Sequence, residues 1–222
     1  MNGHSRCLRP GRLLHRFASA VTLIALTLGS SCLDAHAPDG HSGIDHRLNP
    51  DEVGIWARGN QRTIHFGLIG AAIAGALIEG TETRLGLTFW RATEAAALEV
   101  ATVAVLKRAT SRARPSQGND PNLWFQGARR QSFPSDEVAL SAAVTTPFIR
   151  EYRREHSGVW MLALIPIYVG IARMKSQAHW QTDVLAGLGI GVASGYLASE
   201  RDRPIFLTIS GDGVYIGLRY RW

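Results

Sequence analysis

Five apolar stretches follow one another along the chain and are separated by polar segments. They cover roughly residues 64–80, 92–106, 138–149, 159–172 and 184–198. Each is long enough for an α-helix but shorter than the roughly 20 residues that a membrane-spanning helix prefers. The pattern therefore predicts an all-α fold, a bundle of five to six helices. By itself it leaves open short membrane spans or the buried helices of a soluble bundle.

The N-terminal segment has a different pattern, in which basic residues precede an apolar run. Arginines at positions 6, 9, 12 and 16 come before the run over residues 17–29. This layout is typical of a signal peptide or of a first membrane helix, and residues 1–33 are predicted to be one or the other. Cleavage stays open, because Pro38 directly follows a sequence at 35–37 that looks like a cleavage site. Residues 34–63 are polar and predict an extracytoplasmic loop.

The last residues of the chain alternate in a way that predicts strands. Residues 205–209 and 214–222 flank Ser-Gly-Asp-Gly, and apolar side chains recur at every second position of the later segment. We therefore expect a β-hairpin within residues 200–222, after a helical core over residues 64–199. One hairpin cannot close a membrane barrel, so a capping role is the simpler interpretation.

Two observations favour a membrane-embedded bundle. Gly187, Gly191 and Gly195 recur at four-residue spacing, which lets helix backbones approach closely, although the same spacing also serves a soluble bundle. If the 17–29 run is a first helix, the N-terminal arginines and those within 150–154 fall on one side, which the positive-inside rule places in the cytoplasm. We expect a bacterial-type inner-membrane protein, with an exported periplasmic or lipid-anchored protein as the alternative.

Composition excludes some classes of function. The 222 residues carry a formal net charge of +6, yet the positive charge lies in separate clusters and not in one basic stripe. We therefore expect no nucleic-acid partner. Cys7 and Cys32 are the only cysteines, which excludes a disulfide framework. The histidines and aspartates within 34–46 match no closed zinc pattern, so we expect a polar loop there and no metal.

Two separate segments hold residue types that bind and attack phosphate. Lys107 is followed after six residues by Arg114-Pro115, and Arg173 is followed by His179 and then by Asp183. Lysine and arginine supply fixed positive charge and donors suited to phosphate oxygens. A histidine with a carboxylate four residues further on supplies an oriented nucleophile.

A third segment, Pro134-Ser135-Asp136-Glu137, lies just before the apolar stretch that begins at residue 138. Ser135 and the neighbouring backbone N–H groups are candidates to bind an anion at a helix N-terminus. A plain N-cap is the alternative role for Ser135. The six-helix topology that places the arginines in the cytoplasm puts all three segments together on the external side.

The first and last of these segments resemble the outer motifs of the type 2 phosphatidic acid phosphatase superfamily, which also contains the vanadium haloperoxidases. The resemblance implies that Lys107, Arg114 and Arg173 bind phosphate oxygens. It further implies that His179 attacks phosphorus and forms a phosphohistidine, while Asp183 orients the imidazole.

The middle segment departs from the family, which has Pro-Ser-Gly-His there. Asp136 and Glu137 replace the glycine and the histidine. Glu137 can serve as the general acid in place of histidine only if its pKa is raised. A carboxylate of Asp136 at ~4 Å from a phosphate would repel it by about 4 kcal/mol at an effective dielectric constant of 20. We therefore expect Asp136 to point away or to pair with an arginine.

These residues predict a membrane phosphatase that needs no metal or other cofactor. Its expected substrate is a lipid-linked phosphomonoester or diphosphate, such as a polyprenyl diphosphate, because phosphate is a better leaving group than an alkoxide. The alternative is a catalytically weakened or inactive protein that binds phosphate or a lipid headgroup on the same fold. A vanadate-dependent haloperoxidase fits less well, because the chain is short and lacks the middle histidine. The natural substrate and the oligomeric state stay open.

Overall fold

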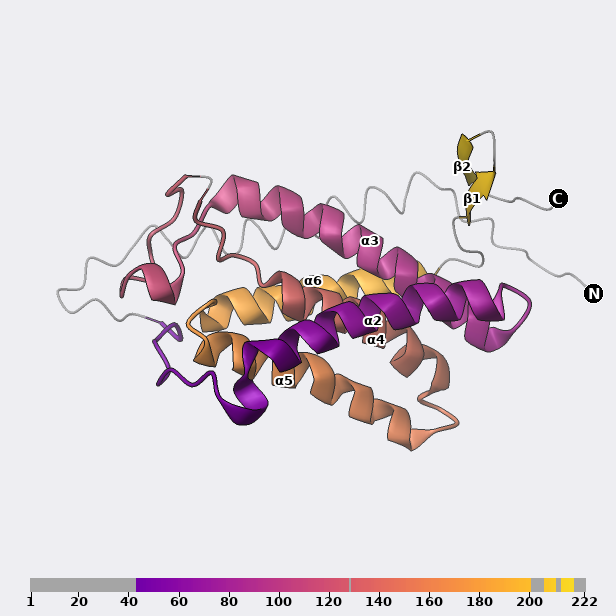
Figure 1. The fold of residues 1–222 in the computed structure, drawn as a ribbon, viewed down its shortest axis with the longest axis horizontal. Coiled ribbons are helices and arrows are strands. Elements are labelled where there is room, and N and C mark those ends of the chain that lie inside the picture. The colour runs from indigo at the N-terminus through magenta and orange to yellow at the C-terminus, as the bar shows by residue number, and fades with distance from the viewer. Residues whose placement is uncertain (1–42, 128, 201–205, 211–212, 218–222) are drawn as a thin grey trace, which may run out of the picture. The chain divides into compact units, whose positions relative to one another are not determined.

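The computed structural model describes residues 43–127, 129–200, 206–210 and 213–217. The main elements in this part of the chain are α-helices that lie side by side in a bundle (Figure 1). They are α2 (Arg58–Glu79), α3 (Arg84–Thr110), α4 (Asp136–Tyr152), α5 (Leu164–Lys175) and α6 (Gln181–Ser199). Each contains most of one predicted apolar stretch, so the all-α prediction is confirmed for the described residues. The run over residues 17–29 lies outside them.

Capping interactions place the helix ends beyond the apolar stretches. Helix α3 begins eight residues before its predicted stretch, at Arg84, because the Thr83 hydroxyl accepts a hydrogen bond from the backbone N–H of Gly86 at 2.9 Å. It ends at Ser111, which has a left-handed backbone with φ of 41°. Three short 3₁₀ helices complete the described helices: η1 (Gly54–Trp56), η2 (Pro115–Gln117) and η3 (Ser157–Ala163).

Helix α6 packs closely against α4 through its glycines. A Cβ atom at Gly191 would lie 2.1 Å from the carbonyl oxygen of Ala139, and one at Gly187 would lie 2.4 Å from that of Ser135. At Gly195 the nearest atom is Cβ of Thr146, at 2.5 Å. The expectation that these small residues allow close backbone approach is confirmed. The contact also sets the register of the two helices.

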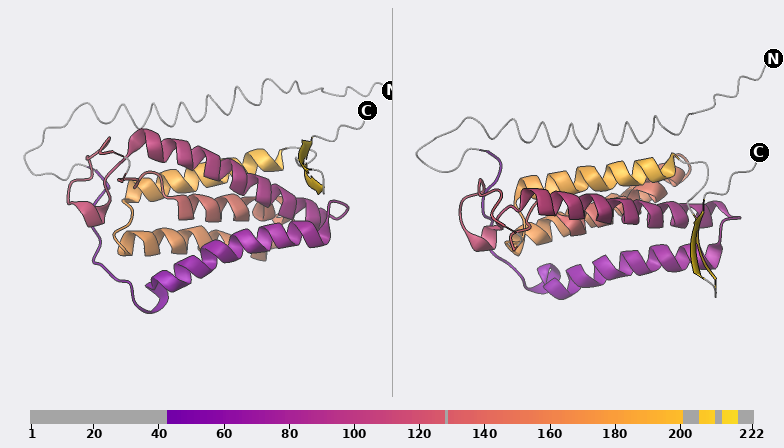
Figure 2. Two further views of the ribbon diagram at one scale, coloured as in Figure 1. Left: turned by 45° about the horizontal axis from the view of Figure 1, so that its top comes forward. Right: turned by 90° about the horizontal axis from the view of Figure 1, so that it is seen from above.

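The order of the helices brings the three motif segments to one end of the bundle. Helices α3 and α5 end there, whereas α4 and α6 begin there, and Figure 2 shows the helices running along a common direction. Arg150 and Arg153 lie at the other end of α4. The predicted convergence of the motif segments is therefore observed.

The two described strands form the expected hairpin. Strand β1 (Phe206–Ser210) pairs antiparallel with β2 (Gly213–Gly217), in a register that runs from Phe206 opposite Gly217 to Ser210 opposite Gly213. Residue 205, the predicted start of the first strand, lies outside the described residues, and β2 begins one residue before the predicted position 214. Residues 218–222, predicted to continue the second strand, lie outside the described part.

Two described helical segments are long and apolar enough to cross a membrane by length and composition, α2 and Ser157–Lys175. Large apolar side chains on both are exposed to the surroundings of the chain. They include Phe66, Leu77 and Ile78 on α2, and Trp160, Leu164 and Ile167 on the second segment. Such a surface suits an apolar environment better than water.

Candidate active site

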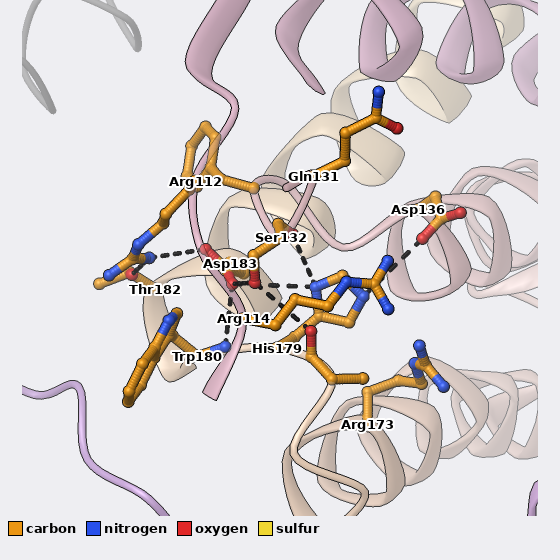
Figure 3. Close-up of polar contacts among 12 residues, drawn as sticks. Arg112, Arg114, Gln131, Ser132, Asp136, Arg173, His179, Trp180, Thr182 and Asp183 are labelled. Carbon is orange, nitrogen blue, oxygen red and sulfur yellow. Dashed lines mark hydrogen bonds and ion pairs between the residues drawn. The ribbon is translucent and has the colours of Figure 1, made fainter. Parts of the chain in front are cut away.

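Side chains from all three motif segments point into one region at the end of the bundle (Figure 3). Lys107 lies in the last turn of α3 and Arg173 in the last turn of α5. Asp136 begins α4, and His179 lies in the loop between α5 and α6. Residues 66 positions apart, at 107 and 173, are thus brought together by helix packing.

The imidazole of His179 has one ring nitrogen engaged and one free. The residue is 1% exposed, and Nδ1 lies 2.7 Å from the carbonyl oxygen of Ser132. Because a carbonyl oxygen only accepts hydrogen bonds, Nδ1 carries the proton and the lone pair is on Nε2. Among the described residues Nε2 has no hydrogen-bond partner, and it faces Asp136 Oδ1 at 3.9 Å. This is the tautomer that a nucleophile at Nε2 requires.

Asp183 supports the histidine indirectly, which differs from the expected carboxylate–imidazole hydrogen bond. Its Oδ2 lies 3.8 Å from Nδ1 of His179, too far for a hydrogen bond. The same oxygen accepts from the Ser132 hydroxyl at 2.5 Å and from the backbone N–H of Trp180 at 2.9 Å. Asp183 therefore holds the two backbone segments that position the ring.

Arg112 neutralises Asp183, a role that the sequence analysis did not assign. It is 2% exposed, donates to Oδ1 of Asp183 at 2.6 Å and lies over the ring of Trp124 at 4.5 Å. It also pairs with Asp45 at 2.6 Å. The sequence offered little signal, because Arg112 lies in a basic run where Arg108, an exposed neighbour, looks the same.

The segment around Asp45 is tied to the start of α6. Asp45 accepts hydrogen bonds from the backbone N–H of Thr182 at 2.8 Å and from its hydroxyl at 2.7 Å. His46 and Gln181 exchange two further bonds, each between a backbone group and the glutamine side chain. Part of the predicted polar loop thus packs against the loop that contains His179.

Asp136 lies inside the site. Its Oδ1 is 3.2 Å from Nζ of Lys107, so the residue neither points away nor pairs with an arginine as expected. Lys107 also donates to the backbone carbonyl of Gln131 at 3.3 Å. Burial raises the pKa of Asp136, but the charge of Lys107 and its hydrogen bond to the carboxylate, together with the charge of Arg173, outweigh it and hold the pKa well below the ordinary value. The site therefore contains a carboxylate beside the candidate nucleophile.

Glu137 does not meet the condition for a general acid. Two nitrogens of Arg58 bind its carboxylate at 2.6 and 2.9 Å, and Nε of Arg173 lies 3.5 Å away. Burial raises the pKa of Glu137, but the two arginines lower it by more, so the pKa lies below its usual value. The raised pKa that the role of general acid requires is therefore not found at Glu137. Arg58 was not singled out from the sequence, since it starts α2 and belongs to no motif.

The remaining predicted phosphate ligands have free donors. Figure 3 shows the Arg114 guanidinium directed toward the space between Asp136 and Arg173, and it makes no ion pair among the described residues. Arg173 is buried and donates to the Gln61 side chain at 3.2 Å. The Ser135 hydroxyl is buried without a described partner, while its N–H donates to the backbone carbonyl of Asp183 at 3.0 Å. Ser135 is thus the N-cap of α4 by position, without a side-chain capping bond.

Electrostatics keep the buried His179–Asp183 pair in one charge state. Burial lowers the pKa of His179, and the charge of Arg173 acts in the same direction, against the opposing effects of Asp183 and Asp136. Burial raises the pKa of Asp183, but His179, Arg112 and Ser132 more than offset it, so the pKa of Asp183 lies below its usual value. At neutral pH the site therefore holds a neutral imidazole beside an ionised aspartate.

The arrangement places cationic side chains beside a free imidazole nitrogen, which is chemically able to bind an oxyanion, and one comparison with known proteins shows the family. The sequence model of the PAP2 superfamily matches residues 88–203, just over half of the chain. The chain belongs to the PAP2 superfamily, which supports a phosphoric ester hydrolase.

Other comparisons add less. No curated protein matches the sequence. The crystal structure of Aquifex aeolicus LpxE is similar to this chain at a TM-score of 0.49 and 21% sequence identity, covering 64% of this chain and 84% of that one. Among the residues that the structure describes, no group of three or more His, Cys, Asp or Glu is placed to hold a metal ion.

Proposed function

We propose that the protein hydrolyses a lipid-linked phosphomonoester or diphosphate through a phosphohistidine at His179. The observation that supports this most directly is the free Nε2 of a buried, tautomerically fixed imidazole. Arg114 and Arg173 lie around the same space (Figure 3), and Lys107 pairs with the Asp136 carboxylate that faces Nε2. PAP2 membership supports the reaction class.

Binding in this proposal rests on three cations. Lys107, Arg114 and Arg173 hold the oxygens of the transferred phosphoryl group, and Arg173 is kept in place by Glu137 and Gln61. The buried Ser135 hydroxyl supplies a further donor. Such fixed donors stabilise the charge that develops on the phosphoryl oxygens in the transition state.

The chemical steps use the two ring nitrogens of His179 differently. Nε2 attacks phosphorus, the bond from phosphorus to the leaving oxygen breaks, and a phosphohistidine forms. Nδ1 keeps its hydrogen on the Ser132 carbonyl, and the carboxylate of Asp183, 3.8 Å away, stabilises the resulting cation. Water then attacks phosphorus, releases phosphate and restores the free imidazole.

The leaving oxygen needs a proton, and Asp136 is better placed than Glu137 to relay one from the substrate, since its own lowered pKa leaves it ionised before the substrate binds. Glu137 is held by Arg58 and serves to position Arg173. Asp136 faces the nucleophile and is partly exposed to the space where the substrate binds. A monoanionic phosphate ester brings a proton of its own, which Asp136 shares on binding and passes to the leaving oxygen. In the second step the Asp136 carboxylate takes a proton from the attacking water.

A second candidate function is phosphate or headgroup binding without turnover. One observation favours it: the Asp136 carboxylate pairs with Lys107 in front of His179 Nε2. A group that stays ionised there opposes the binding of a dianion. In this alternative the pocket selects singly charged phosphates and releases them unchanged.

A substrate panel distinguishes the two functions. Purified protein is incubated with p-nitrophenyl phosphate and with a polyprenyl diphosphate from pH 4 to pH 8, and His179→Asn serves as the control. We expect phosphate release that is lost in the variant. Binding of vanadate by the wild type without release of phosphate from either substrate would support the second function. If the wild type neither binds vanadate nor releases phosphate, both proposed functions are contradicted.

For localisation, we propose an inner-membrane protein whose active site faces the periplasm or exterior. The apolar exterior of α2 and of Ser157–Lys175 supports membrane association. An exported periplasmic or lipid-anchored protein is the alternative.

A further inference from the structure

A cavity of 310 Å³ opens directly beside the phosphate site, between α2, α3 and α4. Lys107 and Asp136 are among its lining residues, so the cavity borders the proposed site for the phosphoryl group. Its other lining residues include His65 of α2 and Glu99 of α3. Any substrate whose phosphate is bound by Lys107 has this space next to it.

Glu99 is a buried acid that lacks a partner. It is 1% exposed, and Oε1 has no hydrogen-bond donor among the described residues. Lys107, two turns further along the same helix, donates instead to Asp136 and to the backbone of Gln131. A buried carboxyl oxygen without a donor is costly to a fold, so such a group commonly marks a place that a ligand completes.

A second polar atom of the cavity lining is also buried without a described hydrogen-bond partner. Nδ1 of His65 is buried and has no described partner, while its ring packs edge-on against Phe66. The rest of the lining is largely apolar and includes Val103 and Leu140. The cavity therefore suits a mainly apolar group with one or two hydrogen-bonding atoms near its phosphate end.

The spacing along α3 limits where those atoms lie. Eight residues separate Glu99 from Lys107, which corresponds to roughly 12 Å of helix rise at about 1.5 Å per residue. Side chains on a helix lean toward its N-terminus, so the ammonium group of Lys107 lies closer to Glu99 than the backbone rise suggests. Both residues line the same cavity, so a group that contacts Glu99 lies within a short chain segment of the phosphate held by Lys107. A simple unsubstituted alkyl or polyprenyl chain has no donor at that position.

We propose that this cavity binds the leaving group of the substrate, and that Glu99 accepts a hydrogen bond from a hydroxyl or ammonium group near its phosphate. The inference rests on the proposed function, because it places the phosphate at Lys107. It narrows the substrate class to amphipathic phosphates with a polar donor beside the phosphorylated carbon. Glu99 then selects the substrate and takes no part in bond breaking.

Binding of non-hydrolysable phosphonates tests the cavity without requiring turnover. Three long-chain alkylphosphonates are compared that differ only at the second carbon, which carries a hydroxyl, an ammonium group or hydrogen. Dissociation constants are measured for the wild type, Glu99→Leu, Glu99→Gln and the control Val105→Ala, an exposed position on the same helix outside the cavity.

The wild type and Val105→Ala are expected to bind the hydroxyl or the ammonium compound at least tenfold more tightly than the unsubstituted one. Glu99→Leu should bring that ratio close to one, and Glu99→Gln should keep part of the preference for the hydroxyl. Which of the two substituted compounds binds better identifies the donor.

Equal binding of all three compounds by the wild type would overturn the inference and leave the proposed function intact. That measurement does not depend on whether Glu99→Leu folds. Failure of the wild type to bind any phosphonate would contradict both the inference and the proposed function, because the phosphate site itself would then be absent.

Discussion

Asp136 stands where the family has glycine, and its carboxylate lies between Lys107 and the imidazole of His179. A single residue thus fills the space that an incoming phosphate must enter. Its neighbour Glu137 is removed from the chemistry by Arg58, although its position in the motif matches the family histidine. The two acidic residues of the middle motif therefore have different roles, and substitutions separate them.

Asp136→Asn should tighten the binding of dianionic phosphate and slow the release of an alkoxide. Removing a negative charge near ~4 Å from the phosphate lowers its repulsion, so affinity at pH 8 should rise at least tenfold. Loss of the proton donor should lower kcat for an alkyl phosphate by 10²- to 10⁴-fold, with a smaller effect on p-nitrophenyl phosphate. Glu155→Gln, which changes net charge equally at the other end of the bundle, is the control. Weaker phosphate binding in Asp136→Asn would contradict the placement of this residue.

The protonation of His179 provides a second test at the residue scale. Burial and Arg173 lower the pKa of the ring, so its NMR titration midpoint in the free protein should lie below the usual value of about 6.5. The nucleophile then stays neutral at mildly acidic pH and is lost only as pH falls through the lowered pKa. Asp136→Asn should move the midpoint lower still, because Asp136 opposes the shift. A midpoint above 6.5 in the wild type would show that the ring is not desolvated as described.

At the scale of helices, the contact between α4 and α6 positions the candidate catalytic groups. The backbone N–H of Ser135 donates to the carbonyl of Asp183, which joins the first turns of the two helices. Gly187 and Gly191 let the backbones approach closely enough for that bond. A change in the spacing of these helices would therefore move Asp183 relative to the start of α4.

Gly191→Ala should destabilise the fold, whereas Gly189→Ala should not. The added Cβ at 191 would lie 2.1 Å from the Ala139 carbonyl oxygen, but the one at 189 meets nothing within 4 Å. We expect a loss of roughly 1–3 kcal/mol in the free energy of unfolding for the first. The second should be neutral or stabilising by about 0.5–1 kcal/mol, because alanine favours a helix over glycine. Equal melting temperatures for the two variants would show that the close contact is not formed.

Most of the helices and the hairpin could be predicted from the sequence. Hydropathy located all five described helices, and alternation located the hairpin, because burial of one face or of a whole helix leaves a periodic pattern. The positions of the helix ends could be predicted less well. Thr83 and Ser111 set the limits of α3 through local capping geometry, which apolar runs do not contain.

The candidate site could be predicted only in part. The cationic and imidazole residues formed recognisable spacings, so their convergence was expected. The pair of Arg58 with Glu137 spans 79 positions, and only the packing of α2 against α4 brings it about. The hydrogen bond from His179 to the Ser132 backbone is likewise invisible to residue identity, because any residue at 132 has a carbonyl oxygen.

For the whole molecule, the motif segments gather at one end of the bundle and the arginines of α4 lie at the other. The proposed membrane topology puts the first end outside the cell and the second in the cytoplasm. Ser116 and Ser157 are exposed serines near the two ends, so each can be replaced by cysteine with little change in volume.

Single-cysteine variants Ser116→Cys and Ser157→Cys, in a background where Cys7 and Cys32 are serine, test that topology. In intact spheroplasts a membrane-impermeant maleimide should label position 116 and not 157, and lysis should expose both. Labelling of 157 alone would reverse the proposed orientation. Labelling of both before lysis, or recovery of the protein in the soluble fraction, would support the exported alternative.

The central claim is that His179 attacks phosphorus, and trapping the covalent intermediate tests it most directly. Protein is mixed with ³²P-labelled substrate and quenched in alkali, where phosphohistidine survives, and the peptide containing residue 179 is analysed by mass spectrometry. We predict label on the imidazole of His179 in the wild type and none in His179→Asn. Turnover by the wild type without label on this residue, or with label on another side chain, would contradict the account.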